Sequence, residues 1–192
     1  MTPGVLASHE GTTLQSLLDA FASGRIPGRV SVVVSNNGDS GALVKARQAG
    51  IQNVHLSSRT HPDPAMLDAA IREVLVAAGV DVVFLAGYMK KLGPVVRGTF
   101  RGRILNTHPA LLPQFGGRGM YGDRVFEAVL EAGEAESGVS IHLVDHEYDT
   151  GSIVRQCRVP VLRPTLRPDR DGRSTVGPSS PSVRRLGALR CL

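Results

Sequence analysis

Short apolar runs, many of them rich in β-branched residues, alternate with longer amphipathic runs over the first 107 residues. The apolar runs cover residues 4–8, 29–35, 53–56, 80–86 and 103–107, and the amphipathic runs cover 12–24, 40–50 and 64–79. Each amphipathic run has apolar residues at helical spacing and ends on a glycine, which favours a helix. Near-continuous apolar strands joined by crossover helices predict a doubly wound α/β fold, with a mostly parallel sheet covered by helices on both faces.

The second half of the chain changes character twice. After a stretch rich in Pro and Gly, the pattern predicts a helix over residues 122–133 and strands over residues 137–144 and 152–161. From residue 162 onward Arg, Pro, Gly and Ser dominate without an apolar period, which is typical of a disordered or loosely docked segment. We therefore expect one domain over residues 1–161 and an atypical tail over residues 162–192.

Composition limits the classes of partner. No apolar run reaches the roughly 18 residues of a membrane span, so we expect a soluble protein without a membrane partner. The start has no evident secretory signal, which makes the cytoplasm the expected location. The net charge of +5 comes from residues 155–192, which carry nine arginines and two aspartates. That segment has no aromatic residue on which a base could stack, so we expect no nucleic-acid partner.

The end of the first predicted strand leads into Gly11, Thr12 and Thr13, which open the next helix. Parallel sheets of this kind bind ligands at the carboxyl ends of their strands. Free backbone N–H groups, a glycine and two hydroxyls suit a phosphate group. Capping of the helix by Thr12 or Thr13 would explain the same residues.

A second strand end opens at residues 85–94 into a glycine, an aromatic residue and the pair Lys90 and Lys91. Its position favours the wall of a ligand site. A solvated turn would have the same composition, so both interpretations stay open.

The stretch 103–109 is the most informative strand end, because a buried run breaks there on polar residues. Asn106 and His108 are two positions apart and share one face of an extended chain, and Pro109 follows them. An amide donor beside an imidazole can polarise a carbonyl, stabilise an oxyanion and pass a proton. The alternative is a histidine whose hydrogen bonds are satisfied in the core.

An acidic loop separates the last two predicted strands and carries Asp145, Glu147 and Asp149. Acidic hairpin loops are common on protein surfaces. A carboxylate delivered beside the imidazole would instead orient it and favour its protonated form.

Together these stretches resemble one family, the phosphoribosylglycinamide formyltransferases, which are folate-dependent enzymes of purine biosynthesis with the formyltransferase fold. The resemblance runs from about residue 5 to about residue 161, and it is carried by Asn106, by His108 in HPALLP and by Asp149 in DTG. It implies that residues 1–161 form a catalytic domain. It also implies transfer of a formyl group from 10-formyltetrahydrofolate to the amine of 5-phosphoribosylglycinamide, without a metal.

The resemblance further implies a role for each site residue. Asn106 would stabilise the oxyanion, His108 would act as the acid, and Asp149 would position His108. Gly11, Thr12 and Thr13 would hold the phosphate of the substrate. The residues implied at the folate are Met89, Lys90, Lys91, Leu92, Asn106, Asp145, His146, Glu147 and Tyr148. The expected partners are these two small molecules, and the expected state is a monomer or a homodimer.

The chain departs from the family pattern at three places. His9 and Glu10 stand in the first loop, where the family usually reads Ser-Gly-x-Gly-Ser-Asn, and a carboxylate beside a phosphate is unfavourable unless it turns away. Pro64 stands where an arginine often contacts the folate. After residue 161 nothing matches the helix-forming segment that contacts the glycinamide substrate in the family.

Three alternatives remain at this point. A formyltetrahydrofolate hydrolase shares the Asn, His and Asp but gives the formyl group to water, and that family carries a further N-terminal domain. A methionyl-tRNA formyltransferase is related but adds a C-terminal domain. An inactive product impaired by its tail would bind folate or phosphate without turnover.

Overall fold

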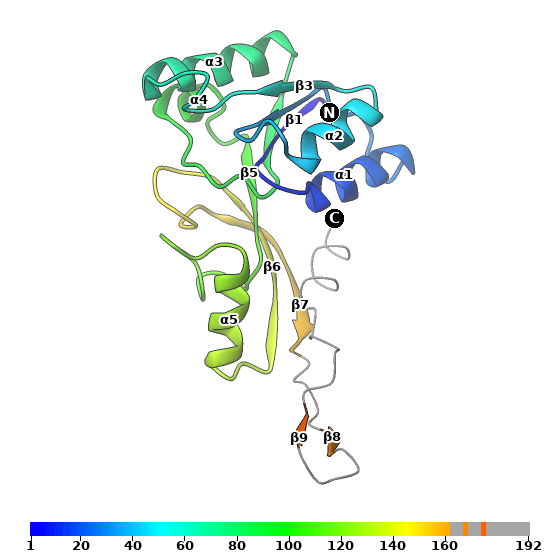
Figure 1. The fold of residues 1–192 in the computed structure, drawn as a ribbon, viewed down its shortest axis with the longest axis vertical. Coiled ribbons are helices and arrows are strands. Elements are labelled where there is room, and N and C mark those ends of the chain that lie inside the picture. Colours follow the sequence, from blue (N-terminus) through cyan, green and yellow to red (C-terminus); the bar gives the residue numbers. More distant parts are fainter. Residues whose placement is uncertain (162–166, 169–173, 176–192) are drawn as a thin grey trace.

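The computed structural model describes residues 1–161, 167–168 and 174–175, and its main feature is a seven-stranded sheet of order β3-β2-β1-β4-β5-β6-β7 (Figure 1). The strands are β1 (Pro3–Ala7), β2 (Val32–Ser35), β3 (Gln52–His55), β4 (Val82–Leu85), β5 (Ile104–His108), β6 (Glu136–Leu143) and β7 (Ile153–Pro160). The first five strands are parallel, whereas β6 and β7 continue the sheet in antiparallel orientation. The mostly parallel sheet that the sequence predicts is confirmed.

Helices cover both faces of the parallel part of the sheet (Figure 1). Within the described residues they are α1 (Thr12–Ala22), α2 (Gly41–Gln48), α3 (Pro64–Ala77), α4 (Pro94–Thr99) and α5 (Asp123–Glu131). α1 and α2 pack on one face, and α3 and α4 pack on the other. This arrangement is the doubly wound fold that the sequence predicts.

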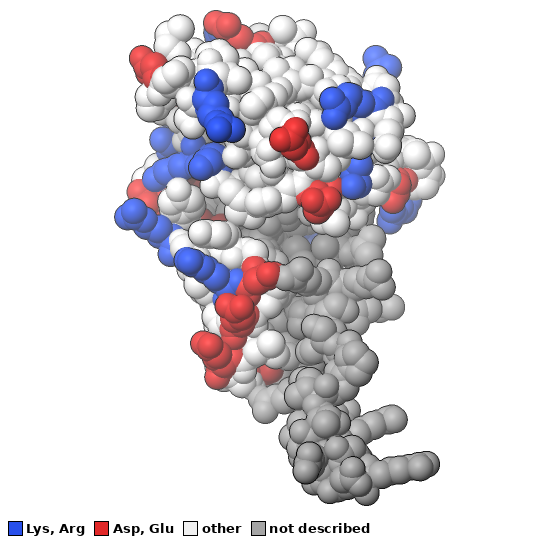
Figure 2. Space-filling view, viewed as in Figure 1, with Lys and Arg blue, Asp and Glu red and all other residues white. Residues whose placement is uncertain are grey.

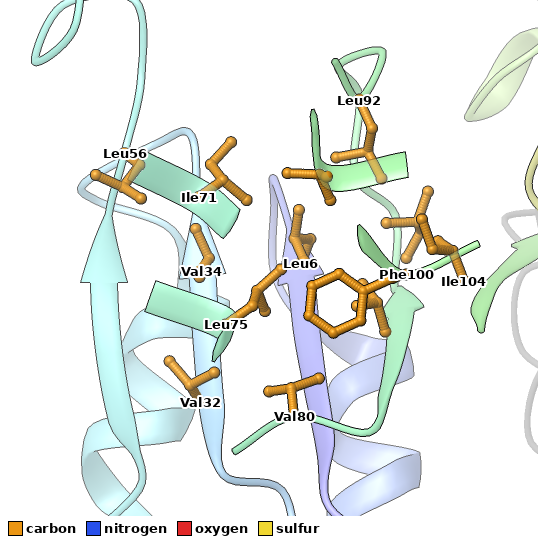
Figure 3. Packing of buried hydrophobic residues seen from close by; sticks show 13 residues of the cluster. Leu6, Val32, Val34, Leu56, Ile71, Leu75, Val80, Leu92, Phe100 and Ile104 are labelled. Atoms are coloured by element: carbon orange, nitrogen blue, oxygen red, sulfur yellow. The ribbon is translucent and has the colours of Figure 1, made fainter. Parts of the chain in front are cut away.

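Successive residues of the central strands supply two separate cores. Leu6 and Val34 pack with Phe100 and other residues on the α3 and α4 face (Figure 3). Val33 packs with Leu17 on the α1 and α2 face. Burial on both faces explains why these strands are continuous apolar runs in the sequence, and each fully buried side chain of this size contributes about 1.5–3 kcal/mol.

Helix α4 (Pro94–Thr99) was not predicted from the sequence, which placed no helix between the loop at residues 85–94 and the strand at residues 103–107. Buried Asp68 of α3 provides the N-terminal hydrogen bonds of α4, because its carboxylate accepts the backbone N–H of Val95 at 2.7 Å and that of Val96 at 3.3 Å. Pro94 supplies a φ suited to the first turn. A cap from a distant helix cannot be seen in a local pattern. Some boundaries also differ, since the strand expected over 29–35 is β2 (Val32–Ser35).

The division of the chain at residue 161 stays a prediction. Of residues 162–192 the structure describes only β8 (Arg167–Pro168) and β9 (Ser174–Thr175), which pair antiparallel with each other. The disorder expected for the tail falls mainly on residues outside the described ones. In the part of the chain that is described, no helix has the length and apolar character needed to cross a membrane. Basic and acidic side chains are interspersed on the face seen in Figure 2.

Candidate active site

The carboxyl end of β5 carries a group of polar side chains that β6 completes. Asn106 and His108 alternate along β5, and the antiparallel register places His142 and Ser140 of β6 directly opposite them. Alternate residues share a face and cross-strand partners are neighbours, so the four side chains lie on one face of the two strands. His108, Ser140 and His142 are buried.

The loop between β6 and β7 adds Asp149 to this group. Its Oδ1 lies 3.4 Å from Asn106 Nδ2 and 3.3 Å from His142 Nε2. Its Oδ2 lies 3.5 Å from His108 Nδ1 and accepts the backbone N–H of Gly117 at 3.0 Å. The structure thus brings together the three residues implied as catalytic. We call Asn106, His108, His142 and Asp149 the polar cluster.

Burial and neighbouring charges set the protonation of the polar cluster. Burial lowers the pKa of His108 below its ordinary value, although Asp149 and the Phe115 carbonyl act in the opposite direction. Burial alone would raise the pKa of Asp149, but the hydrogen bonds that its carboxylate accepts and the charge of the neighbouring imidazoles outweigh burial and lower it. An ionised carboxylate therefore faces a His108 that is mainly neutral at neutral pH.

The second nitrogen of His108 contacts the chain that follows β5. Its Nε2 lies 2.8 Å from the carbonyl oxygen of Phe115. A carbonyl can only accept, so Nε2 carries a hydrogen in this contact and Nδ1 faces Asp149. This contact fixes the tautomer and the ring orientation of His108.

Ser140 and His142 of β6 are site residues that reasoning from the sequence missed. Ser140 Oγ donates to the carbonyl of Ala110 at 2.7 Å and accepts the N–H of Leu112 at 3.0 Å, which fixes the chain beyond His108. Alternation in the run 137–144 puts Ser140 and His142 on one face, and this was the available signal. Their position opposite β5 depends on the register, which a single sequence does not specify.

Two of the loops expected at the folate meet beside the polar cluster. Lys91 Nζ lies 3.8 Å from Glu147 Oε2 and 5.2 Å from the centroid of the Tyr148 ring. Together with Arg118 and Thr150, these residues line a cavity of about 500 Å³. That volume is within the range of small-molecule sites. Arg118 belongs to the loop after β5, to which the sequence assigned no individual role.

The remaining residues expected at the folate differ in their burial and contacts. Leu92 is buried and packs in the core on the α4 face, so its side chain faces the protein interior. Met89 is tied to the residue that follows β1, because its N–H donates to Ser8 Oγ at 2.8 Å. Lys90 and His146 are exposed. Within the described residues, no side chains group as a metal site.

Asp145, also expected at the folate, holds the turn of its own loop. Its carboxylate accepts the N–H of Glu147 at 3.0 Å and the hydroxyl of Thr150 at 2.8 Å. Slight burial would raise the pKa of Asp145, but these hydrogen bonds lower it.

Gly11 is the N-cap of α1, and no side chain caps this helix. The interpretation of Thr12 or Thr13 as a cap is therefore wrong. Gly11 has a φ of 67°, and a Cβ there would lie 2.8 Å from Ala42 Cα. The turn between β1 and α1 thus requires glycine for its conformation and for its close approach to α2.

The structure shows the contacts of Glu10 and Pro64, two of the residues that depart from the family pattern. The Glu10 carboxylate lies against Gly41 at the first residue of α2, and Lys45 Nζ donates to the Glu10 carbonyl at 2.7 Å. Glu10 is exposed. Pro64 is the first residue of α3, where Asp63 caps the helix by accepting the N–H of Ala65 at 2.7 Å.

A doubly wound sheet with an amide, two imidazoles and a carboxylate at the carboxyl edge of β5 defines an α/β enzyme equipped for proton transfer and oxyanion stabilisation. Comparison with known families identifies the enzyme family. Residues 4–169 match the family model described as formyl transferase. The chain belongs to the formyl transferase family, as the sequence resemblance implied.

Several proteins similar to this chain are named phosphoribosylglycinamide formyltransferase or glycinamide ribonucleotide transformylase. The chain is 41% identical over 158 residues to a phosphoribosylglycinamide formyltransferase of Haemophilus influenzae, covering 82% of this chain and 72% of that protein. A chloroplastic phosphoribosylglycinamide formyltransferase of Arabidopsis thaliana is 40% identical, and the match spans 82% of this chain and 54% of that protein. The structure of glycinamide ribonucleotide transformylase 1 from Symbiobacterium toebii superposes with a TM-score of 0.79 at 42% identity, covering 85% of this chain and 74% of that one.

Proposed function

We propose that the chain transfers the formyl group of 10-formyltetrahydrofolate to the primary amine of 5-phosphoribosylglycinamide, a step of purine biosynthesis. One observation carries the proposal, namely the meeting of Asn106, His108 and Asp149 at the carboxyl end of β5. The similarity to named phosphoribosylglycinamide formyltransferases supports the same reaction. A cytoplasmic location and a monomeric or homodimeric state belong to the same proposal.

Asn106 is the electrophilic group of this proposal. The amine nitrogen attacks the formyl carbon, a C–N bond forms, and negative charge develops on the formyl oxygen. An amide N–H directed at that oxygen stabilises the charge in a site where water is scarce. Loss of one such donor typically costs on the order of 10²- to 10³-fold in rate.

His108 carries the proton between the two nitrogens. The attacking amine must lose a proton, and the folate nitrogen must gain one as its bond to the formyl carbon breaks. Because burial lowers the pKa of His108, the neutral ring can accept the first proton at Nδ1, beside Asp149, and the imidazolium can then give up a proton to the folate nitrogen. Since Nε2–H donates to Phe115, transfer from Nε2 requires this segment to shift or a water to mediate.

Asp149 complements both steps. Its lowered pKa keeps it ionised at neutral pH, so it stabilises the imidazolium that forms when His108 takes a proton. Its hydrogen bond from Gly117 ties the loop after β5 to the loop after β6. The carboxylate therefore orients His108 once Nδ1 is protonated, and it holds the two loops around the reacting groups.

The folate site of this proposal is the cavity lined by Lys91, Arg118, Glu147, Tyr148 and Thr150. Its volume of about 500 Å³ and its position next to Asp149 suit a bound pteridine or benzoyl group with an acidic tail at a cationic rim. When bound, 10-formyltetrahydrofolate supplies an activated formyl group. The chain supplies Tyr148 as an aromatic wall and Lys91 and Arg118 as cations.

The phosphate site of this proposal is the turn formed by Gly11, Thr12 and Thr13. No side chain caps α1, so its first N–H groups can bind an anion. A dedicated phosphate site favours a phosphorylated amine over water as the formyl acceptor, which argues against the hydrolase. The Glu10 carboxylate lies against α2, where the positive helix end offsets part of its charge.

Steady-state turnover with the full chain tests the proposal. We expect tetrahydrofolate release that depends on 5-phosphoribosylglycinamide. Equal release without the amine would identify a hydrolase. Folate binding without any turnover would identify an inactive binding product.

A further inference from the structure

His142 is buried opposite Asn106 and lies within contact of three polar groups. Its Nδ1 is 2.9 Å from the carbonyl oxygen of Leu143. Its Nε2 is 3.0 Å from Asn106 Nδ2 and 3.3 Å from Asp149 Oδ1. Both ring nitrogens therefore have a partner, and neither is directed at the cavity.

The Leu143 carbonyl selects one tautomer of the neutral ring. A carbonyl oxygen only accepts, so Nδ1 carries the hydrogen and Nε2 presents a lone pair. A lone pair needs a donor, and of the two ends of the Asn106 amide only the nitrogen can donate. His142 thus distinguishes the amide nitrogen of Asn106 from its oxygen.

The distances among Asn106, His142 and Asp149 also bear on how many N–H groups of the Asn106 amide remain available to a ligand. Nδ2 lies 3.0 Å from His142 Nε2 and 3.4 Å from Asp149 Oδ1, and these two acceptors are 3.3 Å apart. The triangle is nearly equilateral, so both acceptors lie within a narrower angle than the two N–H bonds of a planar amide. One N–H can therefore serve both acceptors, and that arrangement leaves the second N–H for another acceptor.

We propose that His142 is a positioning residue: with Nδ1–H bound by the Leu143 carbonyl, its Nε2 lone pair holds the Asn106 amide with its nitrogen inward, and one N–H is left for the formyl oxygen. The inference rests on the proposed function for the identity of that acceptor. If Nε2 carried a proton, it would donate that proton to Asp149 or to the amide oxygen of Asn106. The amide N–H of Asn106 could then not face His142 Nε2. His142 would then act through Asn106 rather than on the substrate.

Nitrogen-15 NMR of the histidines in the full chain tests the tautomer without requiring turnover. We expect the spectrum of a neutral Nδ1–H ring for His142 at the pH of the activity assay. An Nε2–H tautomer or an imidazolium at that pH would overturn the proposal. Because this result does not depend on substrate, it separates the inference from any failure of the proposed function.

Two substitutions of His142 test its effect on catalysis. His142→Phe keeps a ring but removes the acceptor, and we expect kcat to fall roughly 10- to 100-fold with KM for both substrates within about 3-fold. His142→Gln restores an acceptor and should recover part of kcat. The matched control is His55→Gln on β3, at the opposite edge of the sheet. Equal kcat for His142→Phe and wild type would contradict the proposal.

A double-mutant cycle with Asn106→Ala tests whether His142 acts through the amide. If it does, His142→Phe lowers kcat by less than about 3-fold once Asn106 has been removed. A full 10- to 100-fold loss in that background would show that His142 acts independently, which rejects the proposal. Thermal unfolding of each variant shows whether a loss of kcat comes from misfolding. If His142→Phe is misfolded, kcat of His142→Gln and the NMR spectrum of the wild type decide whether the proposal holds.

Discussion

The polar cluster and the turn between β1 and α1 lie at the same edge of the sheet but are built differently. In the cluster, side chains of β5, β6 and a loop contact one another, and most of their polar atoms have a partner within the protein. In the turn, Gly11 gives the backbone its shape while Thr12 is exposed, and no side chain caps α1. The cluster is arranged to orient its own side chains, and the turn leaves its backbone donors for a ligand.

This difference separates chemistry from binding. Substitutions in the cluster should change kcat, because in the proposed mechanism the groups that move protons and stabilise charge are held there. Substitutions in the turn should change KM for the phosphorylated substrate. His108→Gln in the cluster, and Gly11→Ala and Glu10→Gln in the turn, test that separation.

The largest effect is expected for His108→Gln. Without the proton carrier, we expect kcat to fall on the order of 10²- to 10⁴-fold, while the folate Kd stays within about 3-fold. Steady-state kinetics and folate titration on one preparation measure both. A loss of less than 10-fold would place the proton transfer elsewhere.

Gly11→Ala should break the turn. The φ of 67° and the approach of a Cβ to Ala42 together cost about 1–3 kcal/mol of stability, and we expect KM for the phosphorylated substrate to rise roughly 10-fold. Gly50→Ala is the matched control, because Gly50 has a φ of 66° in open space. If both variants lose the same stability, close packing against α2 does not contribute.

Glu10→Gln should improve binding. Removing one negative charge near the phosphate should lower KM for the phosphorylated substrate about 2- to 5-fold, with kcat unchanged, because an exposed charge acts through screened solvent. The difference should shrink as salt is added. An unchanged KM at low salt would show that the phosphate binds elsewhere.

The smallest effect is on the pH dependence of stability. The folded pKa of His108 is lowered, so the unfolded chain binds more protons than the folded one as pH falls below the ordinary histidine value of about 6.5. The stabilisation from this group is therefore present above about pH 6.5 and is lost as pH falls through the lowered pKa. In thermal unfolding, we expect His108→Gln to flatten this decline by a few degrees. An identical decline in both proteins would contradict the lowered pKa.

Much of the fold and part of the site could be predicted from the sequence. The apolar runs gave β1 to β5 because both faces of those strands are buried, and the spacing of Asn106 and His108 gave one shared face. Helix α4 was not predicted because its cap, Asp68, is distant in the sequence. His142 escaped because its contact with Asn106 depends on the register of β6 against β5, which one sequence does not determine.

The most direct test measures folate Kd and single-turnover formyl transfer on the same samples of wild-type chain and His108→Gln. We expect the wild type to transfer the formyl group only when 5-phosphoribosylglycinamide is present. His108→Gln should bind folate equally well but transfer at least 100-fold more slowly. Equal transfer by the two proteins, or folate binding without transfer by the wild type, would contradict formyl transfer at the polar cluster.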